Sequence, residues 1–277
     1  YKEPLITEKT LIIVVSQSGE TADTLAVLRD GKKQGARVLA ITNVVGSSVS
    51  REAHDVIYTL AGPEIAVAST KAYVTQLVAF YILGLYFASL KETVSEEYVE
   101  EIKKELLAIP EKIEAVLENQ EGVKKYAAEN YEQRDIYFLG RGVDYAVALE
   151  GSLKLKEISY IHCDAYAGGE LKHGPIALID KGTAVITLLT QEALKDKMIS
   201  NVREVSTRGG NIFAIANQGD EIAKTVAEEV VYIPKTVDLL TPLVSVVPLQ
   251  LLSYYVAKNK GCDVDKPRNL AKSVTVE

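Results

Sequence analysis

The first part of the chain alternates short apolar runs with stretches in which apolar residues recur every three or four positions. Leu11 to Val15 is an unbroken aliphatic run, which is typical of a buried parallel strand. Leu25 and Leu28 follow at helical spacing, and Gly35 is a common residue just beyond a helix end. The pattern predicts a strand at residues 10–15 and a helix at residues 21–34.

The alternation continues along the rest of the chain. Apolar runs of strand length predict further strands at residues 37–42, 56–60, 136–140, 184–189 and 212–216. Longer patterns predict helices at residues 70–90, 145–160 and 239–258, and another that ends at residue 207. Regular alternation of strand and helix predicts an α/β fold in which each parallel sheet is flanked by helices.

The pattern of the first part recurs in the second part. The matches at one fixed offset are Ile41-Thr42-Asn43 with Ile215-Ala216-Asn217, Arg29-Asp30 with Arg203-Glu204, and Tyr58 with Tyr232. We interpret the chain as two tandem copies of one α/β domain. The second copy opens with the strand at 136–140 and the helix at 145–160, which have no counterpart in the first copy. We therefore expect the first copy to be truncated at its N-terminus.

These patterns predict four segments. The first domain is expected at residues 1–94, and a charged helical connector that contains Pro110 is expected at residues 95–130. The second domain is expected at residues 131–258, and a C-terminal tail at residues 259–277.

Composition and charge limit the classes of binding partner and the cellular compartments with which the sequence is compatible. The 277 residues carry a net charge of -7 with a pI near 5.3, which argues against nucleic acid as a main partner. No N-terminal signal pattern is present, and the apolar stretch at residues 77–90 is expected to be too short to span a membrane and to form a buried or interface helix. Two cysteines, Cys163 and Cys262, suit a reducing cytoplasm. The three histidines lack metal-ligand spacing, so no metal site is expected.

The segment Ser16 to Thr24 carries the first candidate site. It joins a predicted strand to a predicted helix, and the N–H groups and positive dipole end of such a helix favour an anion. Ser16, Ser18 and Thr21 add neutral hydroxyl donors, and Gly19 allows close approach. The alternative is an ordinary helix start with Ser18 or Thr21 as N-cap. The lysine of a nucleotide P-loop is absent, which argues against a nucleoside triphosphate.

The second copy differs at this segment. At the fixed offset, the sequence Thr190-Gln191-Glu192-Ala193 replaces Ser16-Gln17-Ser18-Gly19. A carboxylate in place of a serine and the loss of the glycine are expected to repel an anion. The sequence therefore predicts one phosphate site, in the first copy.

Six motifs in this order resemble those of one family. They are Ser16 to Thr24, Glu64 to Lys71, Gly140-Arg141-Gly142, Ala148 to Glu157, Gly169 to Pro175, and the tail Lys266 to Glu277. Together they resemble the isomerase half of the glutamine–fructose-6-phosphate aminotransferase family, which is built from two sugar-isomerase (SIS) domains. The resemblance covers essentially the whole chain. It implies formation of glucosamine 6-phosphate from fructose 6-phosphate without a cofactor, with ammonia supplied by a glutaminase domain that is absent from this chain.

The resemblance assigns roles to residues near the middle of the chain. It implies that Glu157 is the base that moves a proton between neighbouring carbons, and that Lys154 assists at the sugar hydroxyls, with Glu150 in support. Without it, Glu157 and Lys154 also fit a surface ion pair, since they lie three positions apart on a helix. His173 is implied to open the sugar ring and to act in the site of a neighbouring subunit, which implies a homodimer. A loop histidine between glycines is otherwise more often exposed and inert.

Further roles fall on the tail and on the phosphate side. The resemblance implies that Lys272 forms an imine with the open-chain ketose, and an imine requires a neutral amine although a solvated lysine has a pKa of about 10.4. We expect the tail around Lys272 to be packed, because Leu270, Ala271 and Val274 are apolar. The residues implied to contact the substrate are Ser16, Gln17, Ser18, Thr21, Val67, Ser69 and Ala271.

Two other functions stay open on the sequence. Sugar-isomerase domains also serve in regulators that bind a sugar phosphate without catalysis, but a sensor needs the hydroxyl loop and not Glu157, His173 and Lys272 together. A related deaminase would run the reaction toward ammonia release, and the sequence does not distinguish the two directions.

Overall fold

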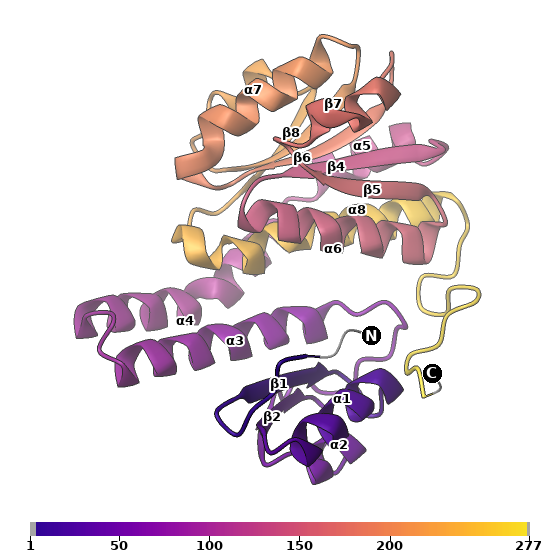
Figure 1. The fold of residues 1–277 in the computed structure, drawn as a ribbon. Helices are drawn as coiled ribbons and strands as arrows, with labels where there is room; N and C mark the ends of the chain where they lie inside the picture. Colours follow the sequence, from indigo (N-terminus) through magenta and orange to yellow (C-terminus); the bar gives the residue numbers. More distant parts are fainter. Residues whose placement is uncertain (1–3, 276–277) are drawn as a thin grey trace. The chain divides into compact units, whose positions relative to one another are not determined.

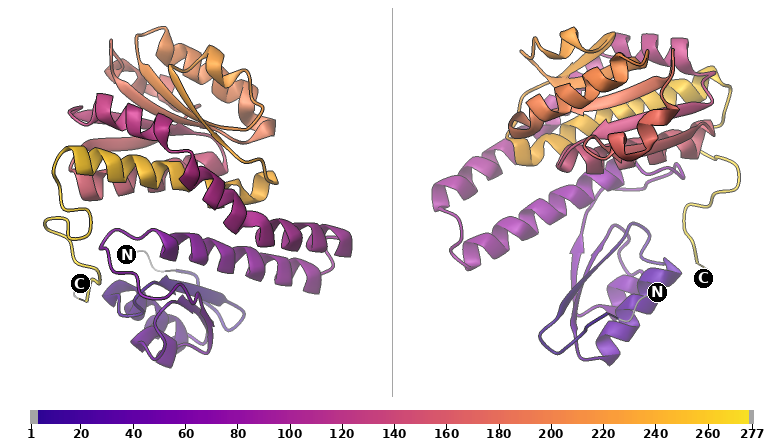
Figure 2. Two further views of the ribbon diagram at one scale, coloured as in Figure 1. Left: turned by 180° about the vertical axis from the view of Figure 1, so that it is seen from behind. Right: turned by 45° about the horizontal axis from the view of Figure 1, so that its top comes forward.

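The computed structural model describes residues 4–275 and divides the chain into two compact units. One unit contains Tyr1–Ser95 and Arg268–Glu277, and the other contains Glu96–Pro267. Residues 1–3 and 276–277 lie outside the described residues, and they include the start of the predicted first domain and the end of the tail motif. Each unit has its own parallel sheet (Figures 1 and 2).

The first unit contains three strands and three helices. They are β1 (Leu11–Ser16), α1 (Ala22–Lys33), β2 (Arg37–Thr42), α2 (Ser48–Glu52), β3 (Asp55–Tyr58) and α3 (Lys71–Leu90). The strands are parallel and pair in the order β1-β2-β3. Side chains on one face of this sheet, such as Val14, Val38 and Ala40, form a core with Leu25 and Leu28 of α1. The helix and the sheet therefore meet as the alternation of the sequence predicts.

The opposite face of this sheet borders an apolar groove of about 600 Å³. Leu11, Leu39 and Ile57 line it from the three strands. The groove is lined on the other side by residues of α3, namely Ile82, Leu83, Tyr86, Phe87 and Leu90. Helix α3 thus leaves much of its apolar surface outside the core.

The second unit begins with the two connector helices and continues into a larger sheet. Its helices are α4 (Glu96–Glu118), α5 (Glu121–Asn130), α6 (Val143–Ser159), α7 (Lys195–Ser206) and α8 (Thr241–Asn259). Its strands are β4 (Asp135–Gly140), β5 (His162–Ala167), β6 (Ala184–Leu189), β7 (Asn211–Asn217) and β8 (Glu229–Ile233). Short 3-10 helices are η1 (Leu171–His173), η2 (Pro175–Leu178), η3 (Glu192–Leu194), η4 (Ala223–Thr225) and η5 (Asp238–Leu240).

The second unit is layered around a five-stranded parallel sheet. The strand order is β5-β4-β6-β7-β8, so β5 pairs on one side of β4 and the chain then continues with β6 on its other side. Figure 1 shows α7 on one face of the sheet and α6 with α8 on the other. Helix α8 is buried along most of its length and packs against α6 and α5. The carboxyl ends of β4 and β6 flank the switch point, where sheets of this type bind ligands.

The register of the two sheets confirms the internal repeat. Thr42 pairs with Tyr58 across β2 and β3, and Ala216 pairs with Tyr232 across β7 and β8. The pairs lie at the fixed offset that the sequence predicts. Strands β1-β2-β3 thus correspond to β6-β7-β8.

The offset between corresponding residues of the two copies is one position smaller before β2 and β7 than within these strands. Ser16 pairs with Thr42, whereas Leu189 pairs with Ala216, so Ser16 corresponds to Leu189. The turn after α1 has the three residues 34–36, and the turn after α7 has the four residues 207–210. The extra residue lies in that turn. The predicted matches of Arg29-Asp30 with Arg203-Glu204 and of Ser16 with Thr190 are therefore wrong by one position.

Two helices are long and apolar enough to cross a membrane by length and composition, namely residues Lys71–Leu90 and Asp238–Asn259. The expectation that the first of them is too short is wrong, because α3 has 20 residues. Only 11% of its apolar window is buried, against 72% for the second helix. The buried share of the second helix is that of a helix in the core of a folded unit.

Several boundaries follow the prediction closely. Strands β2 and β6 have the predicted bounds, and most other predicted elements differ by one to three residues at either end. The residues of the predicted connector form α4 and α5, and α4 continues through Pro110. The short helix α2 and the edge strands β5 and β8 were not predicted as elements. Strand β5 contains His162 and Asp164 and has no apolar run, whereas β8 was missed although Val230 to Ile233 are apolar.

Candidate active site

The loop after β1 folds around its own hydroxyl groups. Ser16 is buried, and its Oγ accepts the N–H of Gly19 at 3.0 Å and lies 2.9 Å from Thr21 Oγ1. Ser18 Oγ accepts the N–H of Glu20 at 3.2 Å. Thr21 occupies the N-cap position of α1 but makes no side-chain cap bond. The ordinary N-cap role therefore does not explain the Thr21 hydroxyl, which faces Ser16 instead.

Gly19 is required by the backbone at this loop. Its φ is +68°, a conformation that residues with a side chain rarely adopt. A Cβ at this position would also overlap the side chain of Ser47. Glu20 accepts the N–H of Ser48 at 2.8 Å, and this bond holds the pKa of Glu20 below its usual value. The loop is thereby tied to the start of α2.

The C-terminal tail is bonded to the same unit. Lys272 Nζ donates to the carbonyl oxygen of Ala66 at 2.8 Å and lies 3.3 Å from Ser69 Oγ and 3.4 Å from the carbonyl oxygen of Val67. Ser273 Oγ lies 3.0 Å from Ser18 Oγ. The structure therefore brings Lys272 together with Val67 and Ser69, and it brings the tail to the hydroxyl loop.

The predicted apolar packing of the tail is wrong. Leu270 is 46% exposed, Val274 is 53% exposed, and Ala271 is exposed as well. Polar contacts hold the tail instead, including a bond from the N–H of Ala22 to the carbonyl oxygen of Val274 at 3.1 Å. The alternation of apolar and charged residues suggested a buried strip, but these three apolar side chains point away from the unit.

A charged cluster on α6 holds the predicted proton-transfer residues. Lys154 Nζ lies 2.6 Å from Glu157 Oε2 and 3.5 Å from Glu150 Oε1. The Lys154 side chain is 6% exposed, and Glu157 and Glu150 are 21% and 13% exposed. This burial contradicts the alternative of a surface ion pair. Burial also raises the pKa of Glu150, opposed by the charge of Lys154.

The cluster carries one cation between two carboxylates. Residues at positions i, i+4 and i+7 lie on one face of a helix, which is why the three side chains meet. Glu150 and Glu157 therefore share the ammonium group of Lys154.

His173 lies apart from this cluster in the short helix η1. Its side chain is exposed, and its N–H donates to the carbonyl oxygen of Glu170 at 3.0 Å. The segment before it is anchored to the carboxyl end of β4, because the N–H of Gly168 donates to the carbonyl oxygen of Gly140 at 2.9 Å.

The loop after β6 differs from its counterpart in the first unit. By the register, Leu189 and Leu194 replace Ser16 and Thr21. Glu192 is expected to repel an anion, but its carboxylate lies 2.8 Å from Lys195 Nζ, which it shares with Asp220 at 3.2 Å. The loss of the hydroxyl side chains distinguishes the second loop more clearly than Glu192 does.

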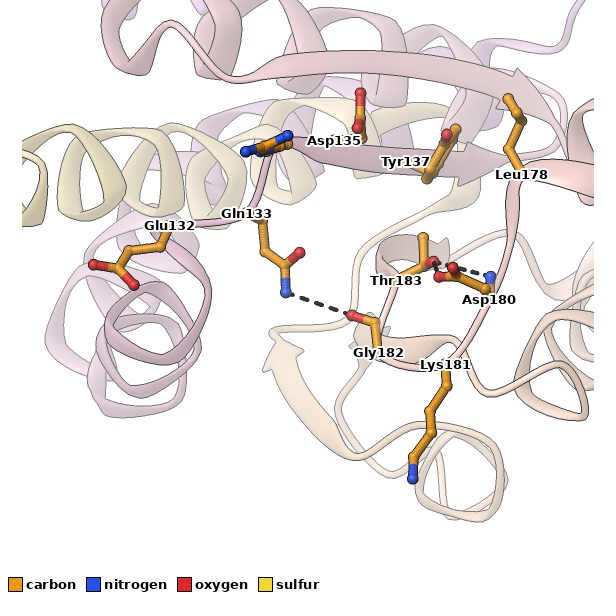
Figure 3. A pocket seen from close by; sticks show the side chains of 10 residues that line it. Glu132, Gln133, Asp135, Tyr137, Leu178, Asp180, Lys181, Gly182 and Thr183 are labelled. Atoms are coloured by element: carbon orange, nitrogen blue, oxygen red, sulfur yellow. Dashed lines mark hydrogen bonds between the residues drawn. The ribbon is translucent and has the colours of Figure 1, made fainter.

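A polar pocket of about 510 Å³ lies elsewhere in the second unit (Figure 3). Asp135 and Thr183 line it at the amino ends of β4 and β6. Its hydroxyl and carboxylate groups bond within one turn, since Thr183 Oγ1 donates to Asp180 Oδ1 at 2.8 Å. None of the predicted site residues lines it. It lies at the opposite edge of the sheet from the switch point.

Within residues 4–275, no group of three or more His, Cys, Asp or Glu side chains is placed to hold a metal ion. Cys163 is buried, which raises the pKa of its thiol to about 12, so it remains protonated at neutral pH.

The profile of the SIS domain matches residues 2–86 and 131–259, which cover most of both copies. This chain belongs to the SIS domain family. The two matched segments correspond to the two repeats that the strand register defines, so the repeat is a pair of SIS domains.

Curated relatives match along the whole chain. The glutamine–fructose-6-phosphate aminotransferase (isomerizing) of Clostridium perfringens is 67% identical over 279 residues, which is 100% of this chain and 46% of that protein. A protein of the same name from Thermus thermophilus is 50% identical over 277 residues, again 100% of this chain and 46% of that protein. The chain spans about half the length of the curated relatives it matches.

Solved SIS structures give the same relationship. The C-terminal domain of glucosamine-fructose-6-phosphate aminotransferase from Francisella tularensis matches with a TM-score of 0.92 and 41% identity, over 96% of this chain and 76% of that one. A glucosamine-6-phosphate deaminase from Thermotoga maritima matches with a TM-score of 0.77 and 25% identity, over 98% of this chain and 77% of that one. Both matches support the predicted fold of parallel sheets flanked by helices.

Sequence reasoning missed the contacts of two residues in the segments of the candidate site. Ser273 bonds to Ser18, and no local pattern indicates a contact across 255 positions. Glu64 Oε2 accepts the N–H of Ala72 at 2.8 Å and so caps α3 from outside the helix. An acidic residue shortly before a long apolar helix is a signal that could have suggested this cap. Gln17 is half-buried and Ala271 is exposed, so both side chains border solvent.

Proposed function

We propose that this chain is the ketose–aldose isomerase part of an enzyme that forms glucosamine 6-phosphate from fructose 6-phosphate. In the full-length enzyme, a glutaminase domain would supply the ammonia. The observation that carries the proposal is the buried cluster of Lys154 between Glu150 and Glu157, because a phosphate-binding sensor has no use for it. The names of the curated relatives support the same activity.

Each step is assigned to residues of this chain. The hydroxyl loop with Ser16, Gln17, Ser18 and Thr21 binds the phosphate, since hydroxyl and N–H donors at a helix N-terminus favour an anion. The contacts of Lys272 to the segment of Val67 and Ser69 support a place for the sugar carbonyl beside that amine. Ala271 is expected to contact the sugar through the backbone.

The chemistry proceeds by loss of water and transfer of one proton. The neutral amine of Lys272 attacks the carbonyl carbon of the open-chain ketose, and water leaves as the imine forms. Ammonia then adds to the imine carbon and Lys272 leaves as the free amine, so that the C=N bond now carries the nitrogen of ammonia. Glu157 removes a proton from the neighbouring carbon and returns it to the former carbonyl carbon, so the base is regenerated. Lys154 donates to the hydroxyl groups next to these carbons, and His173 transfers the proton that opens the sugar ring.

The partners belong to the proposal as well. We infer a homodimer in which His173 acts in the site of the second subunit, and its exposure on the anchored loop supports this role. A cytoplasmic location and the lack of nucleic-acid or membrane partners stay predictions of the sequence. The same holds for the domains at residues 1–94, 95–130, 131–258 and 259–277.

The decisive experiment measures both directions of the reaction. Purified chain is incubated with fructose 6-phosphate and ammonium, and separately with glucosamine 6-phosphate, and the sugar products are quantified. Formation of glucosamine 6-phosphate or glucose 6-phosphate that is lost in Glu157→Gln, but not in the exposed control Glu101→Gln, supports the proposal. Ammonia release as the faster direction would favour a deaminase, which the similarity to the Thermotoga maritima structure keeps as the second candidate. Binding without any conversion would indicate a sensor.

A further inference from the structure

In the loop after β6, N–H and hydroxyl groups donate hydrogen bonds to carboxylates of the same chain. The N–H of Thr190 donates to Asp144 Oδ2 at 2.9 Å, and its hydroxyl donates to Asp144 Oδ1 at 2.5 Å. The N–H of Glu192 donates to Asp238 Oδ2 at 3.3 Å. Asp144 comes from the first turn of α6 and is 2% exposed, and Asp238 comes from η5. Acceptors from two other elements thus satisfy the start of this loop.

The corresponding loop of the first unit satisfies itself. Residues 17–21 correspond to residues 190–194 by the strand register, and both loops have five residues. In the first loop, the N–H groups of Gly19 and Glu20 donate to hydroxyl oxygens of the same loop. The second loop has no hydroxyl at the positions of Ser16, Ser18 and Thr21, and its N–H groups at Thr190 and Glu192 bind negatively charged oxygen atoms instead. A phosphate group would offer these N–H groups the same kind of acceptor.

The position of Asp144 is unfavourable for a carboxylate in other respects. Burial raises the pKa of Asp144 to about 6, and the charge of Asp238 contributes in the same direction. The hydrogen bonds from Thr190 and from the backbone N–H of Gln191 oppose this shift. A buried carboxylate can keep its charge here because its oxygen atoms accept hydrogen bonds from donors that would otherwise be left unpaired.

We propose that Asp144 is a built-in anion that closes the second loop to phosphate. Its carboxylate takes the N–H and hydroxyl groups of Thr190, so that each chain binds phosphate at the loop after β1 and not at the loop after β6. The residue thereby sets the number of phosphate sites. The class of anion rests on the proposed function of the first loop, while the closure itself rests on the contacts of Asp144.

Inorganic phosphate is the probe, and the full chain is the protein. Ser18→Glu removes binding at the first loop, so any phosphate bound in that background reports on the second loop. Titration calorimetry and phosphorus NMR are expected to find no phosphate on Ser18→Glu and one per chain on the double variant with Asp144→Ala. The matched control combines Ser18→Glu with Asp196→Ala, which removes an exposed acidic residue from the first turn of α7 and is expected to bind none.

Loss of Asp144 leaves buried donors of Thr190 unpaired, which weakens the fold. Thermal unfolding is therefore followed at increasing phosphate, and Asp144→Ser provides a milder variant in the same background. Phosphate should raise the unfolding midpoint of both variants more than that of Ser18→Glu, because a ligand of the folded state stabilises it. Folded variants that bind no phosphate overturn the proposal, and so do variants that stay unfolded at high phosphate. If wild type binds no phosphate while the Ser18→Glu, Asp144→Ala chain does, the proposed function fails and the closure by Asp144 stands.

Discussion

The hydroxyl oxygens of Ser18 and Ser273 lie 3.0 Å apart, although 255 positions separate the two residues in the chain. This contact joins the loop after β1 to the segment that carries Lys272. A phosphate at the loop would meet Ser18 and the tail together. Occupancy of the phosphate loop and the position of the proposed imine lysine are therefore linked through one pair of side chains.

Ser18→Glu is expected to abolish binding of fructose 6-phosphate. The new carboxylate would stand among the hydroxyl groups that are proposed to receive the phosphate, and like charges repel at short range. Titration calorimetry measures the loss. Ser89→Glu, an exposed position near the end of α3, adds the same charge to the same unit and should leave the affinity as in wild type. Equal affinities for the two variants would remove the loop from the site.

Lys272→Ala is expected to lose a covalent adduct and to keep most of the affinity. Borohydride added with fructose 6-phosphate should reduce the imine and leave the sugar attached to Lys272, which mass spectrometry locates. Affinity should change by less than about tenfold, or ~1.4 kcal/mol, because the phosphate loop is intact. Lys71→Ala, an exposed lysine of the same unit, should still form the adduct. An adduct on Lys154 instead would exchange the roles of the two lysines.

Mixed dimers test whether His173 acts across the subunit boundary. His173→Ala and Glu157→Gln chains should each be inactive alone. If His173 serves the partner's site, a heterodimer of the two has one complete site, and random mixing should restore about a quarter of the wild-type sites. Activity is measured after joint refolding or co-expression. A mixture as inactive as its components would place His173 in the site of its own chain.

Gly19→Ala is expected to lower the free energy of unfolding by about 1–3 kcal/mol, because it combines a positive φ with overlap at Ser47. Urea unfolding gives the value. Gly46→Ala is the matched control, since Gly46 also has a positive φ but no atom within 4 Å of a built Cβ. The difference between the two variants isolates the overlap, and Ser47→Gly should recover part of it. Equal losses in both variants would show that only the backbone conformation matters.

The raised pKa of Asp144 predicts a pH dependence of stability. The folded chain binds this proton with a pKa of about 6, against about 3.8 for the free side chain, so the carboxyl group favours the folded state at low pH. Between pH 4 and 6 this contribution is lost as pH rises, and wild type should lose up to ~3 kcal/mol relative to Asp144→Asn, which does not titrate. Urea unfolding of both proteins across this range measures the difference. A constant difference would mean that the carboxyl group is not perturbed.

The elements with a clear apolar period were predictable from the sequence, and those that depend on distant contacts were not. Strands β2 and β6 have the predicted bounds because they are continuous buried runs. Strand β5 contains His162 and Asp164 and forms an edge through backbone pairing with β4, so no apolar pattern marks it.

The same distinction applies to the candidate site. Contacts set by helical spacing were predictable, and contacts between distant residues were not. Glu150, Lys154 and Glu157 meet because helical spacing alone places them on one face. Asp144 and Ser273 act through contacts with residues 46 and 255 positions away, and spacing along the chain carries no information about either. The apolar residues Leu270 and Val274 were misread for a similar reason, since a short irregular segment has no period from which its buried side could be inferred.

The additional residue in the turn 207–210 has a practical consequence for loop grafting between the two domains. The loop 190–194 follows Leu189 as the loop 17–21 follows Ser16, so a transplant that is out of frame by one position moves every side chain into its neighbour's place. The sequence Ser-Gln-Ser-Gly-Glu-Thr therefore belongs at residues 189–194, where its first serine inherits the buried position of Leu189. Placed at residues 190–195, as an ungapped alignment suggests, the same six residues would present their hydroxyl groups to the wrong neighbours.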